Sequence, residues 1–201
     1  MNIDIKELPY AQFEKLGLGK KEVLTMKPED LARLLSGNRT GLQRLQVGEF
    51  DIKAKLSLQR NPDGSLAVYV HPVRGQVKND LRLSDQEVDR LKQGRVLMRE
   101  YAGRDGKNEH YYFQLDRETN EILRARAKEL VVPSAIKDVV LSHDQKELLR
   151  QGRAIELESR RGGLLRARID LNQPSGIISI PASGQAIQTT PEQRKHSGPK
   201  R

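Results

Sequence analysis

The most regular alternation of apolar and polar residues lies between residues 50 and 73. From Ile52 to Leu58 every even position is apolar and every odd position is polar, which is typical of a strand with one buried face. The turn-forming residues Asn61-Pro62-Asp63-Gly64 follow, and Leu66, Val68 and Val70 resume the alternation up to Pro72. The pattern predicts a β-hairpin.

A different period precedes this hairpin, and it predicts short helices in the first 45 residues. Pro9 suits a first helical turn, and the run that follows it ends at Gly17. Pro28 opens a second helix whose first turn is acidic, where the helix dipole favours carboxylates. Its apolar stripe is Leu31, Leu34 and Leu35, and Ser36-Gly37 ends it.

A thirteen-residue segment occurs twice, at residues 83–95 and 141–153. The two copies share Leu, Ser, Leu, Gln, Gly and Arg at equivalent positions, which indicates an internal repeat 58 residues apart. In each copy the serine (Ser84 or Ser142) lies three residues before Glu87 or Gln145, the spacing of a capping box. Gly94 or Gly152 follows the last predicted turn of a short helix.

Each predicted helix is followed by three alternating segments, which we interpret as antiparallel strands. They span residues 96–101, 109–115 and 122–127 in the first copy, and 154–159, 164–170 and 176–180 in the second. The fold class expected is α+β, with a small helical-plus-β-hairpin N-terminal domain and two tandem helix–three-stranded antiparallel meander modules. The predicted boundaries are 1–79, 80–133 and 138–183, with a disordered basic tail at 184–201.

Composition narrows the functional classes. The chain has no cysteine, which excludes disulfides, thiolate metal sites and cysteine catalysis. The N-terminus lacks the apolar segment of a signal peptide, and no apolar stretch is long enough for a membrane span. We therefore expect a cytoplasmic protein without membrane association. The formal net charge is +9, but it is spread as a small basic surplus over both folded parts and the tail, as on an ordinary solubilising surface.

No catalytic or metal-binding pattern emerges. None of His71, His110, His143 and His196 has the helical spacing to another ligand that metal sites use. Ser84 and Ser142 are explained as helix caps, and the glycine pairs match neither phosphate-binding nor nucleophile-elbow motifs. We expect no enzyme activity, no cofactor, no metal and no small-molecule substrate.

Arginines on the predicted strands are the candidate binding residues. Arg124 and Arg126 share one strand face, as do Arg166 and Arg168, and Arg160 and Arg161 lie in a neighbouring turn. With Tyr111 and Phe113 on an adjacent strand, this pattern suits nucleic-acid binding by phosphate neutralisation and base stacking. The competing interpretation is an amphipathic sheet with its arginines in solvent and these aromatics in the core, and the same faces could dock a protein.

The segments ELPYAQFEKLGL, LARLLSGNRTGL and AKLSLQRNPDGSLAVYVHPVR resemble the N-terminal domain of unknown function 4099. The segments LSDQEVDRLKQGR and ELVVPSAIKDVVLSHDQKELLRQGRAIELE resemble its partner, domain of unknown function 3945. The resemblance implies a protein of conjugative transposons and other mobile elements of Bacteroidetes, without an assigned activity. We therefore expect a non-enzymatic accessory protein that contacts DNA or a DNA-processing protein. The alternative is a protein–protein adapter or regulator, including an anti-defence factor, without DNA contact.

Overall fold

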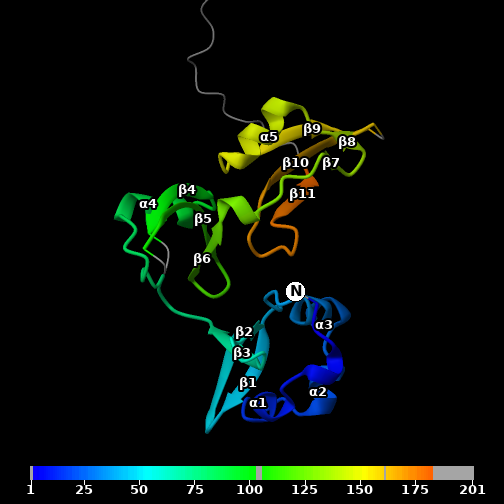
Figure 1. Cartoon of the computed structure of the whole chain (residues 1–201), viewed down its shortest axis with the longest axis vertical. Coiled ribbons are helices and arrows are strands. Elements are labelled where there is room, and N and C mark those ends of the chain that lie inside the picture. The colour runs from blue at the N-terminus through cyan, green and yellow to red at the C-terminus, as the bar shows by residue number, and fades with distance from the viewer. Residues whose placement is uncertain (1, 103–105, 161, 183–201) are drawn as a thin grey trace, which may run out of the picture.

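Three units, each built from helix and sheet, follow one another along the chain (Figure 1). The computed structural model describes residues 2–102, 106–160 and 162–182. Each unit contains a three-stranded antiparallel sheet in which the second strand is central, and each has its own hydrophobic core. The α+β fold class expected from the sequence is confirmed.

The first unit packs its helices on one face of its sheet. Ala54, Leu56 and Leu58 point to these helices and are at most 1% exposed, and Phe13 and Leu34 pack against them in the same core. Its elements are η1 (Ile5–Glu7), α1 (Tyr10–Glu14), α2 (Lys20–Leu24), α3 (Pro28–Leu35), β1 (Gln43–Val47), β2 (Phe50–Arg60) and β3 (Leu66–Pro72).

The second unit begins with a capped helix that covers one face of its sheet. Leu91 of the helix and Phe113 of the central strand are fully buried in the shared core. The elements are α4 (Asp85–Lys92), β4 (Leu97–Ala102), β5 (Asn108–Asp116), β6 (Glu121–Arg126) and η2 (Ala127–Glu129).

The third unit has the same order of elements after a small additional hairpin. Leu149 of its helix packs on Leu157 and Ala167 of the sheet. The elements are β7 (Ala135–Ile136), β8 (Val139–Val140), α5 (His143–Arg150), β9 (Ile155–Glu158), β10 (Leu164–Ile169) and β11 (Ile177–Pro181).

Both predicted capping boxes are present. The Ser84 hydroxyl accepts a hydrogen bond from the Glu87 amide, and the Glu87 carboxylate accepts one from the Ser84 amide. Ser142 and Gln145 make the same reciprocal pair in α5. Gly94 and Gly152 follow the helices with φ of 82° and 76°, the left-handed conformation that glycine adopts without steric cost.

The structure also adds elements that the sequence pattern did not indicate. The hairpin of residues 50–73 is confirmed, but β1 pairs with β2 and makes it a three-stranded sheet. Helix α2 and the hairpin β7–β8 were not predicted; β7 lies between the predicted modules 80–133 and 138–183, and β8 lies at the start of the second of them. The predicted tail at 184–201 lies outside the described residues.

Candidate functional site: a cationic groove where the units meet

Each of the first two sheets has an outer face, turned away from its helices, that is covered by a turn of the following unit. On the outer face of the first sheet, Lys55 is 5% exposed. Its Nζ lies 2.8 Å from Oδ2 of Asp116 and 2.7 Å from the Glu118 carboxylate. Asp116 ends β5 and Glu118 lies in the β5–β6 turn of the second unit. A lysine this deeply buried requires such partners, because an unpaired charge out of water is very costly.

Glu121 is the centre of a second charged cluster at this junction. Arg39 donates to both of its carboxylate oxygens at 3.0 Å, and His71 Nδ1 lies 3.0 Å from Oε2. His71 Nε2 is in turn 2.9 Å from the Ser57 hydroxyl. Burial raises the pKa of Glu121, but the hydrogen bonds from His71 and Arg39 outweigh it and lower the pKa to about 2. The carboxylate is therefore ionised at neutral pH and ties the two units together.

The second junction repeats the arrangement, with the neutral Gln114 in the place of Lys55. Gln114, on the outer face of the second sheet, donates to Asp170 Oδ1 at 3.2 Å and accepts from the Leu171 amide at 2.6 Å. Asp170 and Leu171 begin the β10–β11 turn of the third unit. The Tyr112 hydroxyl donates to the Arg150 carbonyl at 2.5 Å, and burial raises the pKa of Tyr112. In both junctions a side chain of the central strand receives an aspartate that starts a turn.

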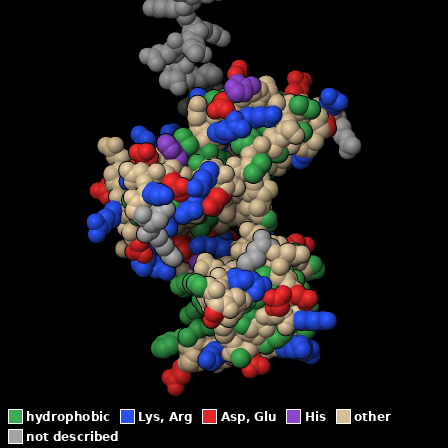
Figure 2. Space-filling model, viewed as in Figure 1, with side chains coloured by type: hydrophobic (Ala, Val, Ile, Leu, Met, Phe, Trp, Pro, Cys, Tyr) green, Lys and Arg blue, Asp and Glu red, His purple; other side chains and the backbone are tan. Residues whose placement is uncertain are grey.

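A groove of about 1010 Å³ lies where the three units meet. The first unit and its linker contribute Arg39, His71, Arg74 and Lys78, and the second unit contributes Glu121 and Arg124. The β10–β11 turn of the third unit closes one end with residues 173–176. Figure 2 shows basic and acidic side chains together along the boundary between the first unit and the other two.

Most cations of the groove are paired, but two arginines are not. Arg39 binds Glu121, Lys78 lies 2.7 Å from Asp80, and Arg126 lies 3.1 Å from Glu109. By contrast, Arg124 makes no ion pair with any described carboxylate, and its guanidinium lies 5.4 Å from the ring centres of Tyr101 and Tyr111. Arg74 likewise has no carboxylate partner in the described part of the chain, and its Nε is buried without a hydrogen bond.

Backbone contacts hold Arg74 in place. Its amide donates to the Thr119 carbonyl at 3.2 Å, and its own carbonyl accepts from Asn120 Nδ2 at 2.6 Å. Thr119 and Asn120 belong to the same β5–β6 turn that carries the partners of Lys55. The linker after β3 is therefore fixed against the second unit, and Arg74 is held beside the groove.

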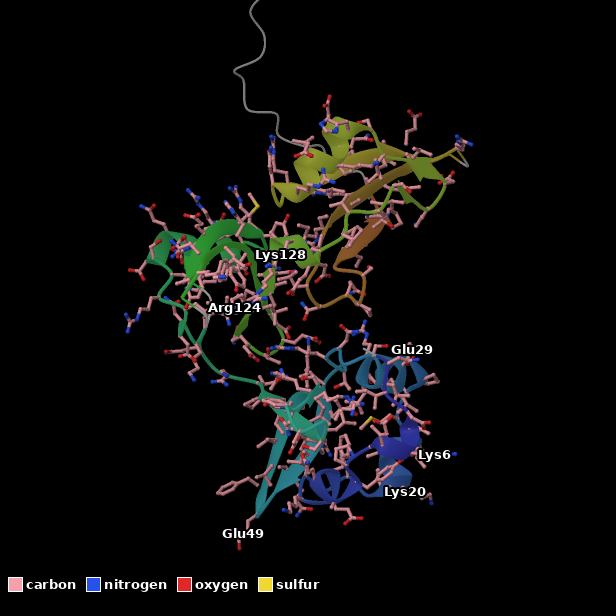
Figure 3. The ribbon with its side chains drawn as sticks, viewed as in Figure 1. Lys6, Lys20, Glu29, Glu49, Arg124 and Lys128 are labelled. Atoms are coloured by element: carbon pink, nitrogen blue, oxygen red, sulfur yellow. The ribbon has the colours of Figure 1, made fainter. Side chains whose placement is uncertain are left out.

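The arginines predicted from the sequence do not form one surface. Arg124 and Arg126 lie on the helix-facing side of the second sheet, because they pair with Phe113 and Tyr111 across β5 and β6. Figure 3 labels Arg124 on the second unit. Arg166 and Arg168 lie on the outer face of the third sheet, turned away from α5. The exposed Arg160 lies in the β9–β10 turn. Arg161 lies outside the described residues.

The aromatic platform suggested by the sequence is not available to a ligand. Tyr111, Tyr112 and Phe113 are at most 4% exposed. Tyr111 and Phe113 belong to the core beneath α4, as the competing interpretation expected, and Tyr112 is covered by the third unit. An exposed aromatic lies instead at Tyr69, which is 41% exposed and pairs with Ser57 on the outer face of the first sheet. Ser57 itself lines the groove.

Sequence reasoning missed Arg39, His71 and Arg74 as groove residues. Their local patterns carry no signal, since Arg39 and its partner Glu121 are 82 positions apart. The described residues contain no group of three metal-ligating side chains and no helix with the length and apolar character needed to cross a bilayer.

The fold and groove define a class of protein: three serial α+β units that enclose a polar, cationic groove. Residues 3–82, which span the first unit and the linker, match the model of a family described as protein of unknown function (DUF4099). No curated protein and no solved structure matches the chain. The resemblance of the first unit is therefore confirmed, and that of the second and third units to domain of unknown function 3945 stays a prediction.

Proposed function

We propose that this protein is a non-enzymatic nucleic-acid-binding accessory protein whose ligand is a single strand held in the groove. The observation that carries the proposal is the pair Arg74 and Arg124, two groove cations without a described carboxylate partner. A cation left unpaired in a polar groove favours an anionic ligand, and the phosphates of nucleic acid supply such charges at regular spacing.

Tyr69 favours a single strand over a duplex. Its ring is partly exposed on the sheet face that continues from the groove. Unpaired bases stack on such rings irrespective of sequence, whereas bases inside a duplex do not reach them. The groove then neutralises the phosphates while Tyr69 supports one base.

The biological setting is a further part of the proposal. The expected resemblance to mobile-element proteins of Bacteroidetes, of which the match of residues 3–82 bears out only the first domain, is the basis for proposing an accessory role on transmissible DNA.

Binding of a fluorescent single-stranded oligonucleotide, followed by anisotropy, tests the proposal. Arg74→Gln with Arg124→Gln should weaken binding about tenfold or more, since each charged contact contributes about 1 kcal/mol. The matched control is Arg160→Gln with Arg166→Gln, which removes the same charge outside the groove and should leave affinity within about twofold. Arg124→Lys keeps the positive charge, so this variant should bind the oligonucleotide nearly as tightly as the wild type does. Equal losses in the groove and control pairs would contradict the proposal.

A protein–protein adapter is the second candidate, because the outer face of the third sheet has no covering element among the described residues. Leu164 and Ile180 on this face are 52% and 44% exposed. Absence of any nucleic-acid binding at about 50 mM salt, where electrostatic attraction is strong, would favour this candidate.

A further inference from the structure

The three units are joined in series by one type of contact, in which a turn of one unit docks on a sheet face of another. The series leaves one turn and one sheet face without a partner among the described residues. The turn between the second and third strands of a unit docks on the outer face of the preceding sheet. The β5–β6 turn covers the first sheet through Asp116, and the β10–β11 turn covers the second sheet through Asp170. The β2–β3 turn of the first unit and the outer face of the third sheet remain without such a contact among the described residues.

The free turn shares one hydrogen bond with the docked turns, although Asp63 lies three residues after the end of β2, whereas Asp116 ends β5 and Asp170 directly follows β10. In each, an aspartate Oδ1 accepts a hydrogen bond from the amide two residues later: Asp63 from Ser65 at 2.9 Å, Asp116 from Glu118 at 3.2 Å, and Asp170 from Asn172 at 3.0 Å. The two docked aspartates are 2% and 8% exposed. Asp63 is exposed, as are all residues from 62 to 65 of its turn.

The free face resembles the docked face of the second sheet. Leu97 pairs with Phe113 in the second unit and Ile155 pairs with Ala167 in the third, so Arg168 stands at the position of Gln114. By the same register, Ile178 and Ile180 stand at the positions of Leu123 and Ala125. Leu123 is 7% exposed, whereas its equivalent Ile178 is partly exposed and Ile180 is 44% exposed.

The outer face of the third sheet is more positively charged than that of the second sheet, which favours binding of a carboxylate. Gln114, which receives Asp170, is neutral, but its equivalent Arg168 is cationic and has a buried Nε without a partner in the described chain. Arg166 lies next to it on the same face. An aspartate in a turn therefore finds here both a cation and a pair of isoleucines.

We propose that a second copy of this chain docks its β2–β3 turn, led by Asp63, on the outer face of the third sheet. The contact joins one end of a molecule to the opposite end of the next. It is heterologous and does not close, so it produces open head-to-tail oligomers. This inference stands independently of nucleic-acid binding, because neither Asp63 nor the third sheet's outer face belongs to the groove.

Sedimentation equilibrium of the full chain tests the proposal. The contact lacks the linker that holds the internal junctions together, so association should be weak and visible between roughly 10 µM and 1 mM. The weight-average mass should rise steadily above the 22.8 kDa of one chain without levelling at a dimer. A mass that stays at one chain throughout, or that levels at two, overturns the proposal.

Two blocking substitutions sharpen the test. Asp63→Lys removes the acid of the turn and Ile180→Glu adds a carboxylate to the face, and each should lower the association constant at least about tenfold. An equimolar mixture should nevertheless form a dimer and nothing larger, because each variant retains the end that the other lacks. Failure of the mixture to associate overturns the proposal.

Matched controls separate this contact from other causes. Glu49→Lys makes the same change of charge at the exposed tip of the β1–β2 hairpin, on the same sheet (Figure 3), and should associate as the wild type does. Asp63→Asn keeps an acceptor for the Ser65 amide and should still weaken association, which distinguishes loss of charge from loss of the turn. A chain ended after Ala182 should associate normally. Loss of association there would assign the contact to the basic tail and overturn the proposal.

Discussion

Glu121 shows how a single residue joins two units through its ionisation. Its pKa is lowered to about 2 because Arg39 and His71 stabilise the carboxylate more than burial disfavours it. A carboxylate whose pKa is depressed by folding adds stability above its unfolded pKa, near 4.5, and loses that contribution as the pH falls toward the folded value.

Glu121→Gln should therefore lower the free energy of unfolding at pH 7 by on the order of 2 kcal/mol. The difference from the wild type should shrink below about pH 4.5 and vanish near pH 2. Urea unfolding at pH 7, 4 and 3 measures it. A difference that stays constant across this range would mean that the carboxylate's charge contributes nothing.

Lys55 and Asp116 form the most deeply buried ion pair in the described chain, with side chains 6% and 2% exposed. Lys55→Met should destabilise the protein by about 3 kcal/mol, because it leaves Asp116 buried with Arg39 at 4.0 Å as its nearest cation. Lys55→Met combined with Asp116→Asn should recover much of the loss, since no buried charge then lacks a partner. Equal losses in the single and double variants, measured by urea unfolding, would contradict this explanation.

Among the helices and strands, the features predicted correctly from the sequence were those that depend on interactions between residues close together in the chain. The capping boxes of α4 and α5 and the glycines after them depend only on residues within one helix, so their spacing was sufficient. Strand β1 was missed because only Leu45 is buried among its polar residues. Helix α2 buries Val23 alone, and β7 and β8 have two residues each, too few to show a period.

Ser84→Ala and Ser142→Ala should each lower stability by about 1 kcal/mol, the usual cost of removing the acceptor at a helix N-terminus. The expected loss is similar in both because the two capping boxes have the same geometry. Urea midpoints measure it. Unchanged midpoints in both variants would show that the caps do not contribute.

Gly152→Ala should cost more than Gly94→Ala, although both residues have a positive φ. An added Cβ at Gly94 would lie 2.8 Å from Nη2 of Arg117, a flexible side chain that can move away. At Gly152 it would lie 3.2 Å from the carbonyl oxygen of Val96, which is backbone of the neighbouring unit. We expect about 1 kcal/mol at Gly94 from the conformation alone and more at Gly152. The reverse order in thermal unfolding would contradict the packing described here.

For the whole molecule, the sequence predicted the α+β fold class but not how the units meet. The Arg39–Glu121 and Lys55–Asp116 contacts join segments 82 and 61 positions apart, and no periodic pattern relates such distant residues. The aromatic residues illustrate the same limit: alternation placed Tyr111 and Phe113 on one strand face, but only the packing of α4 shows that this face is the core. The groove follows from docking of the units, so its unpaired arginines could not be chosen from the sequence.

The central claim is that Arg74 and Arg124 neutralise phosphates in the groove, and the salt dependence of binding tests it most directly. Each phosphate neutralised on a single strand contributes about 0.7 to the slope of log affinity against log salt concentration. Arg74→Gln with Arg124→Gln should therefore flatten the wild-type slope by about 1.4, while Arg160→Gln with Arg166→Gln leaves it unchanged. A groove variant with the wild-type slope, or a wild type that binds no single strand at about 50 mM salt, would contradict the account.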